Sequence, residues 1–359
     1  SSYENLSKQH SDRYQFILPY FNFDTAFDND FGRIDFFSNG NNILQNTNNL
    51  RTRIINDINF SSRDFLNSKT GFKSNINLYF KNVNTVAKKD TIYKSSPQSE
   101  LMNILEFNTS YPVIKKSDNN TQLITPKLSM RVNPGDMKNH SGTERTINAN
   151  NIFSINRLGL EDSLESGKSL TLGLEYANNN LNNNDEVNAK IGTVLRDGEE
   201  NPIPQKTTLN KKNSYLFGTF DFKKEDFLNL EYNFAYDGDT SSIKYHDFGF
   251  NFSVNNFVTN FNFISEDGEV GSNEIITNTT EFKFNNENNL KFKTSKDLKN
   301  DFTEYYNLIY SYETDCLIAS AEFNKKFYRD GNLVPEKSLL FTIRFIPFAE
   351  LKPAATSLN

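Results

Sequence analysis

Few residues in this sequence have the types and spacing that chemistry requires. The chain of 359 residues contains one cysteine, Cys316, and three histidines. These residues are far apart in the sequence, which makes a zinc site improbable. Cys316 has no second cysteine to pair with inside the chain, so it is either a free thiol or bonded to a partner outside it.

Enzyme motifs are also missing. The sequence contains no P-loop, G-x-S-x-G, H-E-x-x-H or paired-cysteine motif. The acidic stretch 237–239 lacks the twelve-residue ligand spacing of a calcium loop and favours a tight hairpin turn. Asn156, Arg157 and Asp162 are polar and close in sequence, but hydrogen bonding in a turn or lumen is the default role for them. The sequence therefore predicts no catalytic residues, no cofactor and no metal.

The elements that would position these residues are strands, because apolar and polar residues alternate with a period of two. Phe248, Phe250 and Phe252 share one face of such a run, and Gly249 and Asn251 share the other. The same alternation recurs at 76–80, 124–132, 170–176, 308–313, 317–324 and 339–345. Roughly eighteen runs can be recognised, most near the ten-residue length of a tilted membrane strand. Helical periodicity is not sustained anywhere, so the sequence predicts an all-β chain.

The composition favours a membrane barrel over other all-β folds. The apolar residues are largely aromatic, with 33 Phe and 16 Tyr, and the strands carry charges in their middle, as at Lys127, Arg131 and Lys291. A water-filled lumen accepts such charges while lipid contacts the aromatic face. A soluble sandwich or solenoid also alternates, but so many strands would need several domains, and no linker or fixed repeat separates them.

Charge and segment patterns limit the partners. The net charge is −6, with 45 acidic and 39 basic residues, which argues against nucleic acid, since that partner requires a basic face. No window approaches the length of an apolar transmembrane helix, so any membrane role must be carried by strands. The N-terminal residues show no signal peptide, and we expect the chain to be part of a longer protein.

Several segments carry a more specific signal. The segment 151–176 combines Phe153, Asn156, Arg157, Asp162 and Gly167 ahead of an amphipathic strand. It is similar to a phenylalanine-led strand, an Asn-Arg pair, an Asp and a short turn in the C-terminal barrel domain of the LptD family, the LPS-assembly proteins of Gram-negative outer membranes. The segments 14–24, 191–222, 305–328 and 338–348 also resemble that family, the last two most specifically.

The resemblance implies a fold and a function. The fold would be a large antiparallel transmembrane β-barrel over residues 1–348 with a tail at 349–359, forming the C-terminal portion of a barrel of roughly 26 strands. The first strands and a periplasmic jellyroll would lie upstream. The function would be to insert lipopolysaccharide into the outer leaflet of the Gram-negative outer membrane. The partners would be an LptE-like lipoprotein plug and a periplasmic LptA-like bridge that contacts the upstream domain.

The resemblance also implies two sites. Cysteines at the position of Cys316 form disulfides to the periplasmic N-terminal domain, and here Asp315 leaves room for one such bond. The last strand would form a seam that opens sideways to release lipopolysaccharide. Pro347 would remove one hydrogen bond from that seam, although it is expected simply to end the strand. The residues expected on this strand are Leu339, Phe341, Ile343, Phe345 and Pro347.

Two alternatives remain open at this point. A different outer-membrane barrel, such as a porin or a solute receptor, would share the strand pattern but would be complete in its own chain. A soluble secreted β-protein would show no dependence on detergent. The sequence upstream of Ser1 would separate the first alternative from an LptD-like protein.

Overall fold

The structure is a computed structural model that describes residues 2–3, 14–45, 49–90, 93–180, 183–327, 336–346, 349–351 and 356–357. Apart from two short 3-10 turns, its regular elements are strands, and all of them belong to one sheet. None of the described segments is a helix long and apolar enough to cross a membrane. The prediction of an all-β chain is confirmed.

The strands fall into two groups separated by a long connection. Before it come β1 Ser2–Tyr3, β2 Tyr14–Asp28, β3 Gly32–Gln45, β4 Asn49–Ser62, β5 Phe65–Leu66, β6 Lys73–Lys88, β7 Gln98–Ser110, β8 Val113–Ser117 and β9 Asn120–Asn133. After it come β10 Gly167–Asn180, β11 Asp185–Arg196, β12 Leu216–Lys224, β13 Leu228–Asp237, β14 Ser242–Val254, β15 Phe257–Glu266, β16 Glu274–Lys283, β17 Asn288–Asp297, β18 Phe302–Glu313, β19 Leu317–Lys326, β20 Glu336–Phe345, β21 Ala349–Leu351 and β22 Thr356–Ser357. The two 3-10 turns are η1 Gln205–Thr207 and η2 Gly268–Val270.

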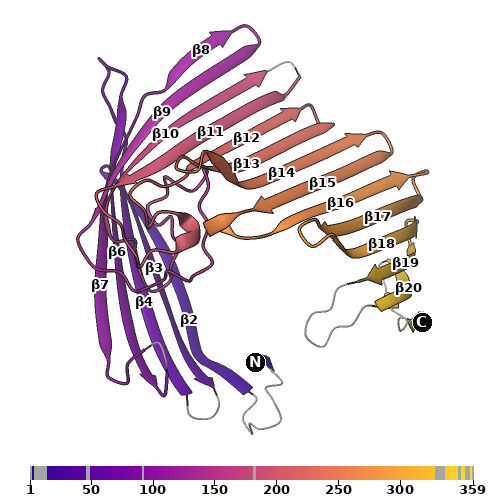
Figure 1. The fold of residues 1–359 in the computed structure, drawn as a ribbon, viewed down its shortest axis with the longest axis horizontal. Helices are drawn as coiled ribbons and strands as arrows, with labels where there is room; N and C mark the ends of the chain where they lie inside the picture. Colours follow the sequence, from indigo (N-terminus) through magenta and orange to yellow (C-terminus); the bar gives the residue numbers. More distant parts are fainter. Residues whose placement is uncertain are drawn as a thin grey trace.

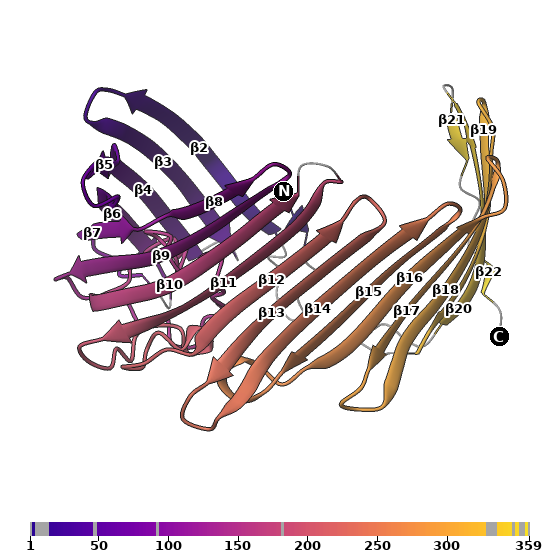
Figure 2. The same cartoon turned by 90° about the horizontal axis from the view of Figure 1, so that it is seen from above.

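Each long strand pairs antiparallel with its neighbour in the sequence, from β2 to β20 (Figure 1). The sheet bends into an open trough, with β2 at one edge and β20 at the other (Figure 2). The strands with nine residues or more are β2, β3, β4, β6, β7 and β9 to β20, close to the number of runs seen in the sequence. An antiparallel meander of this size on one curved sheet is the architecture of an outer-membrane barrel.

The two faces of the sheet differ in chemistry, as the cross-strand pairs show. On one face a row of directly paired residues runs across five strands: Phe220, Tyr232, Phe248, Phe263 and Ile276. On the other face the row one residue away is Asp221, Glu231, Gly249, Asn262, Thr277 and Ser295. One face is therefore aromatic and the other polar. A single curved sheet of this kind does not fit the soluble sandwich, which requires a second sheet packed on the apolar face.

The long connections interrupt this regular pattern. Residues 134–166 join β9 to β10, and residues 197–215 join β11 to β12. The strand expected to begin near Phe153 is wrong, because residues 134–166 form turns and irregular backbone and the next strand starts at Gly167. The physical reason is visible in the sequence: 151–166 does not alternate, and its apolar residues are buried against other strands.

The short C-terminal strands lie at the last long strand. β21 pairs with β20 at Ile343–Phe345, and β22 pairs with it at Ser338–Leu339. Pro347 lies outside the described residues. The division at residue 348 between barrel and tail stays a prediction.

Candidate functional site

The two long connections, residues 134–166 and 197–215, fold together against the polar face of the sheet, and we call them the plug. Their apolar residues form one cluster with Val194, Phe217 and Ala235 on β11 to β13. In a second cluster, Leu164 of the plug packs on β4, β6 and β7. A segment that touches β4 and β13 of the same bent sheet must lie on its concave side. The concave face is therefore the polar one, and the plug occupies the lumen that it would enclose.

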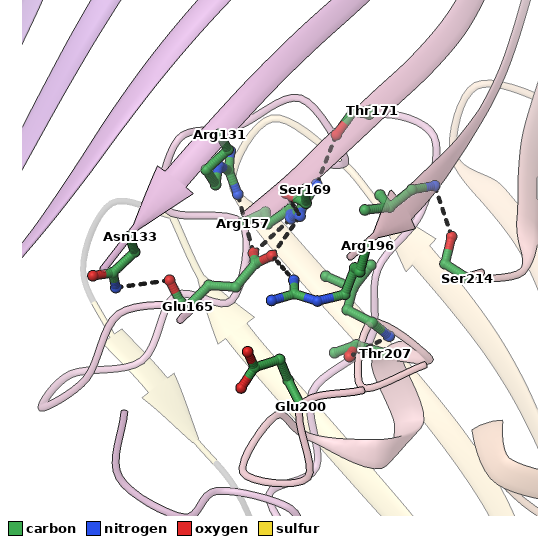
Figure 3. A network of polar contacts seen from close by, with 12 residues as sticks. Arg131, Asn133, Arg157, Glu165, Ser169, Thr171, Arg196, Glu200, Thr207 and Ser214 are labelled. Carbon is green, nitrogen blue, oxygen red and sulfur yellow. Dashed lines mark hydrogen bonds and ion pairs between the residues drawn. The ribbon is translucent and has the colours of Figure 1, made fainter. Parts of the chain in front are cut away.

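Glu165 is the central contact between the plug and the sheet (Figure 3). Arg157, also in the plug, donates to Glu165 Oε1 at 2.5 Å and to Oε2 at 2.7 Å. From the sheet, Arg196 of β11 donates to Oε1 at 2.5 Å and Arg131 of β9 donates to Oε2 at 3.0 Å. The exposed fraction of each of these side chains is 3% or less. One carboxylate thus holds three buried guanidinium groups from two strands and the plug.

Other N–H groups of Arg157 and Arg131 donate hydrogen bonds to side chains of the sheet. Arg157 donates to Thr171 Oγ1 at 2.9 Å and to Ser169 Oγ at 3.1 Å, both on β10 (Figure 3). Arg131 donates to Glu106 Oε2 on β7 at 2.5 Å. Because buried charges are costly unless paired and hydrogen-bonded, this network is stable only when plug and sheet are in place together.

A second polar cluster ties the plug to the first strands. Asp162 accepts a hydrogen bond from the Tyr93 hydroxyl at 2.9 Å, and its carboxylate lies 3.0 Å from His140 Nε2 and 3.6 Å from Lys138 Nζ. One residue earlier, Glu161 contacts Arg53 on β4 at 2.6 Å. This cluster anchors the plug to β4 and to the connection between β6 and β7.

Both plug carboxylates are held in the charged form. Burial acts to raise the pKa of Glu165, but the charges of Arg157 and Arg131 hold it far below its usual range. Burial also acts to raise the pKa of Asp162, but hydrogen bonds from His140 and Tyr93 hold it well below that range. Burial, with the charge of Asp162, raises the pKa of Tyr93 to about 12. These shifts mean that the plug binds best with both carboxylates ionised.

The remaining residues of the 151–176 motif are also in or beside the plug. The Phe153 ring packs against Gly173, and a Cβ added at Gly173 would lie 2.6 Å from the ring. Lys127 Nζ lies 5.7 Å from the ring centroid. Asn156 Nδ2 is 3.5 Å from the Tyr79 hydroxyl. Gly167 has a φ of +82°, and a Cβ there would come within 2.5 Å of Glu200. The structure thus brings together at one site Phe153, Asn156, Arg157, Asp162 and Gly167.

The other expected site lies elsewhere on the sheet. Cys316 is an exposed free cysteine in the turn between β18 and β19, and its carbonyl accepts a hydrogen bond from Ile346 N at 2.9 Å. The turn therefore lies beside the end of β20. Phe341, Ile343 and Phe345 of that strand are 42–54% exposed, and Leu339 lies on the same face, since it pairs with Phe323.

The residues that form the strongest contacts between the plug and the sheet were not identified from the sequence. Glu165 and Glu106 were not singled out, and Arg131 was noted only as a lumenal charge. The available signal was position: Glu106 and Arg131 lie on the polar face of their strands, directly paired with each other. Charged residues at polar-face positions near a long connection would have pointed to this network.

The site contains no arrangement of nucleophile, base and orienting group that would carry out a reaction. Its buried ions are all used to hold one part of the chain against another. The arrangement can close part of a lumen and can be released only by breaking paired charges.

Among solved structures, the fold of this chain is similar to outer-membrane barrels. The ferric enterobactin receptor PfeA of Pseudomonas aeruginosa, in a mutant form, has 9% identity and a TM-score of 0.42 over 96% of this chain and 64% of that one. The siderophore receptor PirA of Acinetobacter baumannii has 8% identity and a TM-score of 0.42 over 90% of this chain and 64% of that one. A porin mutant of Rh. blastica has 12% identity and a TM-score of 0.30 over 92% of this chain and 99% of that one. The chain spans less than two thirds of the two receptors.

Comparison of sequences gives one family. No curated protein matches the chain. The profile of the LptD family, described as LPS transport system D, matches residues 10–290. The match includes the whole plug and most of the sheet, and it ends before Cys316 and β20. The chain therefore belongs to the LptD family and is a β-barrel protein of the Gram-negative outer membrane.

Proposed function

We propose that this chain is the barrel portion of a translocon that inserts lipopolysaccharide into the outer leaflet of the outer membrane. The observation that carries the proposal is the division of the sheet into an aromatic convex face and a polar concave face, in a member of the LPS transport family. The sugar would travel along the polar face, while the acyl chains require contact with lipid. The description of the family as a transport system supports this role.

The exit for the acyl chains would be the seam at β20. Within the described residues, β20 pairs with β19 along its whole length, whereas its other edge pairs only at Ser338–Leu339 and Ile343–Phe345. An open strand edge is costly in hydrocarbon. We therefore infer that the edge of β20 pairs with another strand edge in the membrane, and a closure with few hydrogen bonds would open sideways more easily. The outward residues Leu339, Phe341, Ile343 and Phe345 would line this exit.

The position of Cys316 supports a covalent link to a periplasmic domain. The connections at the end of the sheet that holds residues 314–316 are mostly short, such as 255–256 and 284–287, whereas the plug and 267–273 lie at the other end. Outer-membrane barrels have short periplasmic turns and longer extracellular loops. Cys316 would accordingly face the periplasm, where a disulfide is stable. A band that shifts on reduction in the full-length protein, and is absent in Cys316→Ser, would support this link.

The proposed partners are an LptE-like lipoprotein in the lumen and an LptA-like bridge that contacts an upstream domain. The wall beyond the plug offers the lumenal partner a surface of amides and hydroxyls, such as Asn251, Asn260 and Thr279. Co-purification of the complete protein with such a lipoprotein, and its loss after substitution of these residues, would test the first contact.

Depletion of the protein in cells tests the function itself. Lipopolysaccharide at the cell surface should fall, while the total amount in the cell persists because the molecules no longer reach the outer leaflet. Unchanged surface lipopolysaccharide would reject the proposal and favour a porin or solute receptor, in which case conductance or solute uptake would fall instead.

A further inference from the structure

A cavity of about 410 Å³ lies on the polar face of the sheet, next to the plug. Its walls come from β6, β7 and β9, and Phe153 of the plug closes one side. It lies toward the short connections, because β6 begins and β7 ends there. Its lining includes Lys73, Asn75, Asn108, Thr125, Lys127 and Phe153. Its volume falls within the range of roughly 300–1,000 Å³ typical of small-molecule sites.

The polar groups in this cavity are of the kind that hydrogen-bond hydroxyls. Asn75 and Asn108 offer amides, and Ser110 and Thr125 offer hydroxyls, which can donate and accept. Its two cations already have partners: Lys73 Nζ lies 2.7 Å from Asp64, and Lys127 Nζ lies 2.7 Å from Glu175. The cavity is thus balanced in charge, which favours a neutral polyhydroxylated ligand over a multiply charged anion.

The existing ion pairs present little obstacle to a ligand. The side chains of both pairs are 30–48% exposed, and exposed pairs contribute little to stability. A ligand hydroxyl can therefore share Lys73 or Lys127 at little cost.

Phe153 supplies an apolar surface beside these polar groups. One side of its ring, at Cε2 and Cζ, packs against Gly173 of β10, where a side chain would not fit, and Lys127 Nζ lies 5.7 Å from the ring centroid. The C–H face of a sugar ring is apolar and packs on an aromatic ring, while its hydroxyls reach the surrounding amides. The cavity offers both an aromatic ring for the C–H face of a sugar and amides and hydroxyls for its hydroxyl groups.

The cavity wall is preorganised by a continuous series of hydrogen bonds. Asn75 donates to Asp64 at 3.2 Å, and Asn108 donates to Asn75 at 3.0 Å and to Glu106 at 2.8 Å. Glu106 is in turn bound to Arg131 of the plug network. The amides are consequently held in place before any ligand arrives, which lowers the ordering cost of binding.

We propose that this cavity binds one sugar ring of a glycan in the lumen, with Phe153 as the stacking surface and Asn75, Asn108 and Lys127 as hydrogen-bond partners. The inference rests on the proposed function for the source of the glycan, the carbohydrate part of lipopolysaccharide. The cavity is a contact point on the wall beneath the plug.

The chain contains no tryptophan, so Phe153→Trp adds one indole to this part of the protein, at the cavity, and the same protein with Phe153 supplies the background fluorescence that is subtracted. The complete protein carrying this change, reconstituted in nanodiscs, is titrated with deacylated core oligosaccharide from which the phosphates have been removed. We expect a saturable change in indole fluorescence. Adding Lys127→Met should weaken the apparent affinity at least threefold, and Asn108→Leu at least tenfold.

The matched control is Lys291→Met in the same background. Lys291 also forms a cross-strand pair on the polar face, with Glu281 at 3.3 Å, but it lies far along the sheet from the cavity. We expect it to leave the affinity unchanged. Heat-modifiable gel mobility checks that each variant is folded.

Three outcomes would overturn the inference. The first is no saturable change in a folded protein, and the second is an equal loss of affinity with Lys291→Met and Lys127→Met. The third is binding only of phosphorylated oligosaccharide, which would replace hydroxyl recognition by anion binding. Depletion in cells is independent: surface lipopolysaccharide could depend on the protein while the cavity binds nothing, or the reverse.

Discussion

The lumenal wall of this barrel has two regions that differ in how they handle charge. Where the plug contacts the wall, the charges are buried and shared among several partners, as at Glu165 with its three arginines. From β14 to β20 the polar face carries partly exposed single pairs, such as Lys291 with Glu281. Both regions have an apolar exterior. The difference shows that one strand pattern serves two purposes, a fixed closure in one part and an open wet surface in the other.

Removing the charge of Glu165 should separate the two regions most clearly, because it should have the largest effect on the docking of the plug. In Glu165→Gln three buried arginines lose their shared anion, and breaking a buried pair in this way costs about 3–5 kcal/mol. The plug should leave the wall, which raises single-channel conductance and exposes residues 134–166 to protease. Glu281→Gln in the open region is the matched control and should change neither. Equal behaviour of the two variants would contradict the distinction between the regions.

Acid should release the plug by the same route. The pKa values of Glu165 and Asp162 are lower in the folded state than their usual values. Their stabilisation is therefore complete above the ordinary carboxyl pKa of about 4 and is lost as the pH falls below it. Conductance should stay constant from neutral pH to about pH 5 and rise below about pH 4. A rise that is already complete at pH 5 would show that other groups hold the plug.

Two of the glycines on the polar face, Gly173 and Gly249, offer a smaller, steric test. A Cβ at Gly173 would lie 2.6 Å from the Phe153 ring, whereas at Gly249 the nearest atom is 3.6 Å away. Gly173→Ala should destabilise the docked plug by about 1–3 kcal/mol, the usual cost of overpacking. Gly249→Ala should stay within about 0.5 kcal/mol of the native protein. Protease susceptibility of residues 134–166 in increasing urea measures both.

The smallest effect is expected at Lys291. Its pair with Glu281 is partly exposed, with side chains 35% and 23% accessible, and such pairs contribute about 0–1 kcal/mol. Lys291→Met should shift the unfolding midpoint only slightly, and less at high salt. A shift as large as that of Glu165→Gln would show that the open region is held by its charges too.

The strands could be predicted from the sequence because alternation is a local property. Five residues are enough to show that Phe248, Phe250 and Phe252 share one face, and their direct partners on β13 and β15 lie on that same face. The plug could not be predicted in the same way. Leu164 is buried by Ile104, and Glu165 by Arg131 and Arg196. These contacts join residues at least thirty positions apart, and no local pattern encodes them.

The resemblance located the plug motif but assigned it the wrong local structure. Arg157 and Asp162 belong to the site, yet they lie in irregular backbone and not in a strand. The roles of Cys316 and β20 stay predictions.

The central claim is that alternate residues of each strand face lipid and lumen. Single cysteines at Phe250→Cys and Asn251→Cys, in a Cys316→Ser background, can be labelled with a fluorophore in reconstituted bilayers. The label at 250 should be quenched by brominated lipid and the label at 251 by an aqueous quencher. Aqueous quenching of both labels, or the reverse assignment, would contradict the account.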